Sequence, residues 1–252
     1  RNQLDQPVAI RELKRFAADY AAGLNGKRPR VERKLSTGKS VGIVGAGPAG
    51  LTAAYYLALQ GHDVTIYEAL PVKGGMLAVG IPEYRLPKAH LARDIEIIEG
   101  LGVKIKTGVK VGKDVSLDTL RSNHDAIFLA IGAHKDQRLG IPGEDLNGVL
   151  PGVTFLRDLA LGKKPDVAGK RVIVVGAGNV AMDAARSARR LGARSVSVVY
   201  RRKKEDMPAQ NEEIEAAREE GVEFLTMVNP KEAKGNGAVS AVTCVRMKTG
   251  EF

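Results

Sequence analysis

Two glycine-rich strings in this 252-residue chain have the spacing of a turn that holds phosphate groups. The first string, residues 45–50, matches the pattern GxGxxG. In that pattern the first glycine permits a tight turn, the second lets the backbone approach a pyrophosphate, and the third lets a helix pack on a strand. Free N–H groups at the start of the helix would face the phosphates. The string therefore predicts a dinucleotide site at Gly45, Ala46, Gly47, Pro48, Ala49 and Gly50.

An acidic residue strengthens this prediction. Glu68 ends the next apolar run, where a carboxylate can accept hydrogen bonds from both hydroxyls of a ribose. The string alone does not separate FAD from NAD, because both carry an ADP half. The following segment favours FAD, since Gly74 and Gly75 permit backbone contact with a bulky group and Arg85 is long enough to reach a phosphate or flavin oxygen. A surface turn is the alternative reading of this segment.

The second glycine string, residues 176–181, matches GxGxxA, and the strand after it ends in two arginines instead of an acid. A 2′-phosphate carries about two negative charges, which a guanidinium pair holds and a carboxylate repels. The pattern favours NADPH over NADH at Gly176, Ala177, Gly178, Asn179, Val180, Arg201 and Arg202, with solvated surface arginines as the alternative. Asp183 lies one helical turn after Asn179. We interpret it as a charge near the helix N-terminus or a packing partner and not as a catalyst.

No side chain is predicted to be catalytic and none to bind a metal. Hydride transfer from a nicotinamide to a flavin requires stacked rings and no acid–base group. The single cysteine, Cys244, excludes a disulfide framework and any iron–sulfur cluster held by this chain alone, and its alternating surroundings indicate a strand residue. The histidines lack metal-ligand or triad spacing: His62, His90, His124 and His134.

Composition narrows the class of protein. The chain is 44% hydrophobic and 27% charged, which is typical of a globular protein. Its net charge of +10 is scattered, and without tryptophan and with few aromatic residues it does not favour nucleic-acid binding. No apolar run is long enough to cross a membrane and the start has no signal-peptide core, so a cytoplasmic location is predicted. Because the chain starts at Arg1 and stops after a strand-like run, we expect it to be a piece of a longer polypeptide.

Hydrophobic spacing predicts the elements that position these residues. An amphipathic helix over residues 8–22 precedes an extended linker over 23–39. In the first half of the chain we expect strands at 41–44, 63–68, 103–107 and 125–131 and helices at 49–60 and 88–100. Residues 126–131 of the last of these strands are continuously apolar, which predicts burial on both faces.

The same order recurs in the second half. Strands are expected at 171–175, 195–200, 222–227 and 238–247, and helices at 180–191 and 209–220. The predicted fold class is α/β, with two doubly wound, Rossmann-like domains of the two-dinucleotide-binding flavoprotein type after a short helical segment.

These motifs together resemble a known family. Residues 45–50, Glu68 to Leu77 and Arg85-Leu86-Pro87, with the opening residues 3–10, are similar in order and spacing to the small (beta) subunit of glutamate synthase. The related flavin module occurs in dihydropyrimidine dehydrogenase and in electron-bifurcating ferredoxin:NADP oxidoreductases. The resemblance extends over nearly the whole chain.

The resemblance implies FAD, with its pyrophosphate at the Gly45 turn, its ribose on Glu68 and its distal part beside Gly74, Gly75 and Arg85. It also matches the strand-end turn at residues 130–133, where such proteins return toward the flavin. The full set of implied FAD contacts adds Ala69, Met76, Leu77, Val111, Ala130 and Gly132.

The resemblance also implies a function and a domain plan. Hydride would pass from NADPH to FAD, and electrons would go on to iron–sulfur clusters and a larger amidotransferase subunit, for glutamate synthesis. The clusters would belong to an upstream segment or a partner, since their cysteines are absent here. Residues 1–39 would be the tail of an iron–sulfur domain, 40–150 an FAD-binding domain without its closing segment, and 151–252 an NADP-binding domain.

Two alternatives remain open. The chain could belong to an electron-bifurcating subunit, or to one that serves a ferredoxin- or hydrogenase-type partner. A structural subunit of a redox complex that no longer turns over is the alternative of another class.

Overall fold

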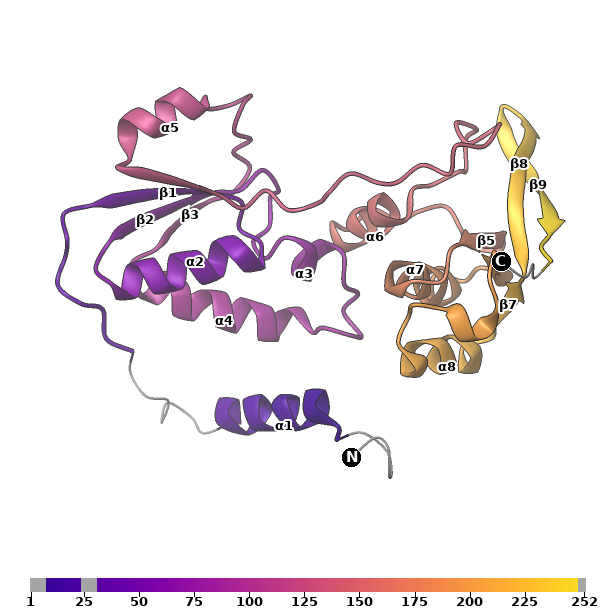
Figure 1. Ribbon diagram of the computed structural model, residues 1–252, viewed down its shortest axis with the longest axis horizontal. Helices are drawn as coiled ribbons and strands as arrows, with labels where there is room; N and C mark the ends of the chain where they lie inside the picture. Colours follow the sequence, from indigo (N-terminus) through magenta and orange to yellow (C-terminus); the bar gives the residue numbers. More distant parts are fainter. Residues whose placement is uncertain (1–7, 24–30, 249–252) are drawn as a thin grey trace.

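The chain forms two parallel sheets, one in each half (Figure 1). The computed structural model describes residues 8–23 and 31–248. The first sheet has the strand order β3-β2-β1-β4 and the second the order β5-β6-β7. We call residues 40–129 the first unit and residues 152–246 the second unit. The predicted α/β class with two-dinucleotide-binding architecture is confirmed.

The first unit surrounds β1 (Ser40–Val44), which pairs in parallel with β2 (Asp63–Tyr67) and β4 (Ala126–Leu129). β2 also pairs with β3 (Lys104–Lys106). Helices α2 (Pro48–Leu59) and α4 (Lys88–Gly100) cover one face, where Ile43, Ile66 and Ile95 are buried together (Figure 1). On the other face α5 (Leu117–Asn123) inserts Leu120 beside Val44. The short helix α3 (Met76–Val79) precedes α4.

The burial predicted for the strand at 125–131 is wrong. Phe128 is 43% exposed, Leu129 59% and Ile131 68%. β4 is the last strand of its sheet and pairs on one side only, with β1, within the described residues. A run of apolar residues therefore indicated a strand correctly, but position at the sheet edge leaves it exposed.

The second unit repeats the arrangement around β6 (Ser195–Tyr200), which pairs in parallel with β5 (Arg171–Val175) and β7 (Val222–Thr226). Its core gathers apolar side chains of α6 (Gly152–Ala160), α7 (Asn179–Arg190) and α8 (Asn211–Glu219) against the sheet. Met182 and Val196 are fully buried there. A short 3₁₀ helix, Lys204–Asp206, lies between β6 and α8.

An antiparallel hairpin of β8 (Val228–Asn236) and β9 (Ala238–Arg246) completes the described second unit. Cys244 lies in β9, as predicted. The segment between the units docks on this hairpin, because the amide of Ala233 donates to the carbonyl of Pro142 at 2.9 Å. The boundaries at residues 39 and 150 stay a prediction.

The predicted amphipathic helix is present as α1 (Ile10–Gly23), next to the first unit (Figure 1). Its apolar residues remain exposed, with Phe16 at 69% and Tyr20 at 64%. The opening residues 3–7 and the linker residues 24–30 lie outside the described residues. Residues 31–39 are irregular and run beside the first unit, where Arg33 pairs with Asp63 at 2.6 Å. None of the described helices is both long enough and apolar enough to cross a membrane.

Candidate cofactor-binding sites

The first glycine turn follows β1 at the carboxyl edge of its sheet. Gly45 has φ +108°, and a Cβ atom there would lie 2.3 Å from the carbonyl oxygen of Ala130. A Cβ at Gly50 would lie 1.9 Å from the carbonyl oxygen of Gly45. Only glycine fits these two positions, because the first needs a left-handed conformation and both lack room for a side chain.

The Gly74-Gly75 segment lies directly against this turn. The amide of Gly74 donates to the carbonyl of Ala46 at 2.8 Å. Gly75 has φ +54°, and a Cβ there would lie 2.7 Å from the Cα of Gly47. The structure thus brings together two predicted parts of the site that are far apart in sequence.

Glu68 fixes the same turn from the end of β2. The side chain is buried, and its Oε2 accepts a hydrogen bond from the amide of Ala46 at 2.7 Å. Its Oε1 accepts from the amide of Leu70, also at 2.7 Å. Each carboxylate oxygen can accept a further hydrogen bond, so the geometry fits a ribose hydroxyl as well as a structural role.

The remaining predicted FAD contacts surround the same edge of the sheet. Ala130 follows β4, and its amide donates to the carbonyl of Val44 at 2.8 Å. Val111 packs in the cluster formed by Val44 and Tyr67. Ala69 and Gly132 are exposed, and Met76 and Leu77 are half-buried at the start of α3. Their contact with FAD stays a prediction.

The second glycine turn has free space around its glycines, whereas other atoms of the chain crowd the first turn. Gly176 has φ +111°, but a Cβ atom at Gly176 or at Gly178 would meet no described atom within 4 Å. Gly178 is the N-cap of α7, and no side chain caps that end. Asn179 and Val180 are exposed, whereas Ala177 is buried. The turn has the room and the free N–H groups that a nucleotide pyrophosphate needs.

Arg201 and Arg202 follow β6 at the carboxyl edge that also holds this turn. Both side chains are exposed, and no carboxylate pairs with either guanidinium within residues 8–23 and 31–248. The loop that follows backs the turn, because Ala209 donates its amide to the carbonyl of Ala177 at 3.2 Å. Two free guanidinium groups beside an open phosphate turn fit a 2′-phosphate.

Arg85 lies in a different environment from the other predicted FAD contacts. Its Nη1 is 2.7 Å from Oδ2 of Asp183, and its Nε is 3.0 Å from Oε1 of Glu213. Both carboxylates belong to the second unit, and Asp183 is buried as the predicted packing partner. The predicted contact of Arg85 with phosphate or flavin stays untested by this geometry.

Burial shifts the pKa of two groups beside Arg85. Loss of water raises the pKa of Asp183 to about 6, although Arg85 opposes the shift. Burial also raises the pKa of Tyr84 to about 12. The sequence did not indicate Tyr84 or Glu213. The sequence signal that was available is a charged residue on the inward-facing side of a helix. That signal does not identify the residue with which the charge pairs.

Chemistry beyond nucleotide binding has no evident centre in the described residues. No group of three or more histidine, cysteine, aspartate or glutamate side chains is arranged to hold a metal ion in that part of the chain. His124 contacts Tyr67 Oη at 3.0 Å, and His62 contacts Thr37 Oγ1 at 2.8 Å. Both histidines have partners that account for their positions.

Comparison with known proteins identifies relatives of this chain. Residues 39–251 match the family model described as pyridine nucleotide-disulphide oxidoreductase. The beta subunit of NADP(+)-dependent formate dehydrogenase from Moorella thermoacetica is 49% identical and aligns with all of this chain. The beta subunit of NADPH-Fe(3+) oxidoreductase from Geobacter sulfurreducens is 47% identical, also over all of it. The small chain of glutamate synthase [NADPH] from Escherichia coli is 41% identical over 97% of it.

These relatives are longer proteins. The chain spans 39% of the formate dehydrogenase subunit, 38% of the Fe(3+) oxidoreductase subunit and 54% of the glutamate synthase chain.

Solved structures share the fold. FprA from Mycobacterium tuberculosis has a TM-score of 0.72 at 22% identity, over 82% of this chain and 64% of FprA. Thioredoxin reductase from Lactococcus lactis has a TM-score of 0.63 at 26% identity, over 84% of this chain and 73% of the reductase.

The family match and the relatives agree with the motifs. The predicted cofactors FAD and NADPH are those of this family, and its members are oxidoreductases. The chain belongs to the pyridine nucleotide-disulphide oxidoreductase family, together with the small chain of glutamate synthase.

Proposed function

We propose that this chain is the NADPH-oxidising flavoprotein part of a larger redox enzyme, with FAD in residues 40–150 and NADPH in residues 151–252. Two observations support the order of the cofactors. The first turn is enclosed by the Gly74-Gly75 segment and braced by Glu68. The second turn is open and lies beside Arg201 and Arg202, which no carboxylate neutralises within the described part of the chain.

The chain's own residues hold and orient the cofactors. Main-chain N–H groups at the start of α2 and of α7 would bind the two pyrophosphates, since no side chain caps either helix. Glu68 would bind a ribose while it holds the Ala46 amide. Bound FAD supplies the hydride acceptor and the means to release electrons singly, so no acid–base side chain is needed.

The exposed arginine pair carries the preference for NADPH. Arg201 and Arg202 together offer two guanidinium groups for one phosphate, and such bidentate, charge-assisted contacts are strong. Because NADH lacks the 2′-phosphate, it gains nothing from them. The preference should therefore disappear when the arginines are removed.

Replacement of both arginines by alanine tests this proposal in the full native chain with FAD. We expect the Kd for NADPH to rise by about 100-fold, as for the loss of two charge-assisted contacts. The Kd for NADH should change by less than about threefold. Arg194→Ala is the matched control, because Arg194 is also exposed but precedes the opposite end of β6. Equal losses for both nucleotides would contradict the assignment of the second site.

The final acceptor is proposed from the relatives. We predicted iron–sulfur clusters and an amidotransferase partner for glutamate synthesis, and the glutamate synthase small chain supports that reading at 41% identity. The formate dehydrogenase and Fe(3+) oxidoreductase beta subunits are more similar, at 49% and 47%. Their similarity favours a second candidate, a subunit that exchanges electrons with another oxidoreductase, as in the hydrogenase-linked alternative.

Purification of the native protein with its partner decides between these candidates. An amidotransferase subunit supports glutamate synthesis, and a dehydrogenase-, hydrogenase- or ferredoxin-type partner supports the second candidate. If NADPH fails to bleach the flavin absorbance of the native chain, the protein is the non-catalytic subunit considered above. A cytoplasmic location stays a prediction.

A further inference from the structure

A single arginine connects the two units electrostatically. Arg85 lies in the loop between α3 and α4 of the first unit. Its two partners are Asp183 on α7, at 2.7 Å, and Glu213 on α8, at 3.0 Å. In the described part of the chain, no other ion pair joins residues 40–129 to residues 152–248. The side chain is only 20% exposed, so water and salt screen these contacts less than they screen surface pairs.

The ion pairs of Arg85, which we call the bridge, join elements that each adjoin one of the two glycine turns. On one side, the Arg85 loop continues from α3 and from Gly75, which touches Gly47 in the first turn. Lys88 stabilises the loop, because its Nζ donates hydrogen bonds to the carbonyl oxygens of Leu77 and Ile81 at 2.9 and 2.5 Å. On the other side, Asp183 lies in α7, which begins at the second turn. Arg85 therefore ties the support of one turn to the helix of the other.

A balanced set of charges surrounds the bridge. Glu213 accepts from Arg85 through Oε1 and from Arg186 through Oε2, and Glu220 pairs with Arg186 and Arg190. We call this set, with Asp183, the Arg85 cluster. The ring of Tyr84, next to Arg85, lies 4.6 Å from the guanidinium carbon of Arg186 and 3.9 Å from that of Arg190. Such cation–π contacts add orientation as well as attraction.

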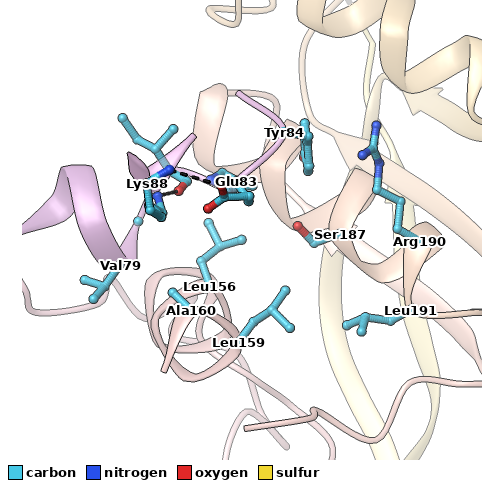
Figure 2. A pocket seen from close by; sticks show the side chains of 13 residues that line it. Val79, Glu83, Tyr84, Lys88, Leu156, Leu159, Ala160, Ser187, Arg190 and Leu191 are labelled. Atoms are coloured by element: carbon cyan, nitrogen blue, oxygen red, sulfur yellow. Dashed lines mark hydrogen bonds between the residues drawn. The ribbon is translucent and has the colours of Figure 1, made fainter. Parts of the chain in front are cut away.

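Apolar packing between the units is incomplete beside this cluster, although α3 contacts α6 there. A cavity of about 350 Å³ separates the loop of the first unit from α6 and α7 (Figure 2). It is lined by Val79 and Ile81 on one side and by Leu156, Leu159 and Leu191 on the other. An interface with such a space can adjust its angle more easily than a close-packed one. The polar contacts of Arg85 and Tyr84 therefore contribute to the orientation that the α3–α6 contact leaves incompletely fixed.

We propose that Arg85 is a positioning residue, whose ion pairs with Asp183 and Glu213 set the orientation of the two cofactor sites for hydride transfer. The inference rests on the proposed function and adds to it the residue that aligns the two sites. Alignment affects the transfer step and not the separate binding of either cofactor. Hydride transfer is sensitive to small displacements, and a misplacement of about 1 Å can cost 100-fold in rate.

Arg85→Gln removes the positive charge but keeps a polar side chain. Arg85→Lys keeps the charge but replaces the planar fork, so it cannot bind both carboxylates in the same way. Arg33→Gln is the matched control. Arg33 is 28% exposed and pairs with Asp63 at 2.6 Å, but this pair does not connect the two units.

The full native chain with FAD is mixed rapidly with saturating NADPH. We expect Arg85→Gln to slow flavin reduction at least about tenfold and Arg85→Lys to slow it less, while the Kd for NADPH and the FAD content change less than about twofold. Hydrogen exchange of the amides at residues 83–86 should become faster in Arg85→Gln. Arg33→Gln should match the wild type in both measurements.

Three results would overturn the inference. The first is an unchanged rate of flavin reduction in an Arg85→Gln variant that folds and binds both cofactors. The second is loss of FAD from Arg85→Gln, which would instead support the predicted FAD contact of Arg85. If Arg85→Gln does not fold, Glu213→Gln is measured in its place, and the third result is an unchanged rate of flavin reduction in that variant. A wild-type chain that NADPH cannot reduce contradicts the proposed function itself, which distinguishes the two failures.

Discussion

Two glycines with the same conformation have different structural reasons for it. Gly45 and Gly176 start the two turns at φ +108° and φ +111°. At Gly45 a methyl group would also collide with the Ala130 carbonyl, 2.3 Å away, whereas at Gly176 it would enter open space. The first glycine is therefore required by the protein itself. The second is required by its conformation and, on our proposal, by the nucleotide.

Alanine at each position separates these reasons. We expect Gly176→Ala to cost about 1–2 kcal/mol in the free energy of unfolding, from backbone strain alone. Gly45→Ala should cost at least about 2 kcal/mol more, because the Ala130 carbonyl must also move. Urea unfolding of the cofactor-free protein measures both. Equal losses would show that the Ala130 contact is relieved without cost, and unchanged NADPH binding by Gly176→Ala would contradict the second site.

The sequence predicted these turn residues because their chemistry is local. Spacing within a few residues determines where a glycine turn meets a helix, and Glu68 is one strand away. Arg85 was predicted only as a cofactor contact. Its observed partner Asp183 is 98 residues distant, and no local pattern indicates which charge it will meet.

At the scale of elements, the loop between α3 and α4 depends on one lysine. Lys88 is half-buried, and burial lowers its pKa. Its Nζ satisfies the carbonyl oxygens of Leu77 and Ile81, on either side of the loop's start. Methionine has a similar length but no donor, so Lys88→Met would leave both carbonyls without this partner. Each such loss costs about 1–3 kcal/mol if the oxygen stays dry.

We therefore expect Lys88→Met to increase hydrogen exchange at residues 80–86 at least about tenfold, which corresponds to about 1.4 kcal/mol of local stability. Exchange in α2 should not change. Lys34→Met serves as the control, since the Lys34 ammonium contacts the exposed side chain of Gln60 at 2.7 Å. If exchange at residues 80–86 is the same in Lys88→Met and wild type, the lysine does not hold the loop.

Prediction of elements succeeded where periodicity and burial agree. The bounds of α4, β5 and β6 match the sequence expectation. β8 was missed, because Pro230 and the glycine near its end are unusual in a strand and lie here at irregular points of the hairpin. α6 was missed as well, since no element was expected between residues 131 and 171. The exposure of β4 was missed because a sequence pattern does not specify which strand lies at the edge.

At the scale of the whole molecule, the contact between the units buries a carboxyl group, that of Asp183, whose burial costs free energy. Asp183 is buried beside Arg85, Arg186, Glu213 and Tyr84, and loss of water raises its pKa to about 6. Burial thus outweighs the attraction of Arg85. Buried ion pairs of this kind contribute little stability, but removal of one partner leaves an uncompensated charge. The Arg85 cluster is accordingly better suited to orienting the units than to stabilising them.

This imbalance predicts a pH dependence. Since the pKa of Asp183 is higher in the folded protein than the ordinary value of 3.8, the folded state binds its proton more tightly. The contribution to stability is complete below about pH 4 and is lost as pH rises through about 6. Asp183→Asn lacks the titrating group but keeps an oxygen that can accept from Arg85.

Urea unfolding at several pH values, followed by circular dichroism, compares the two proteins. We expect the free energy of unfolding of wild type minus that of Asp183→Asn to fall by on the order of 2 kcal/mol between pH 4 and pH 7. Carboxylates far from Asp183 titrate alike in both proteins and cancel. A difference that stays constant or rises with pH would show that Arg85 overcomes the cost of burial. In that case the cluster would stabilise the molecule at neutral pH, and Arg85→Gln should lower its stability as well as slow hydride transfer.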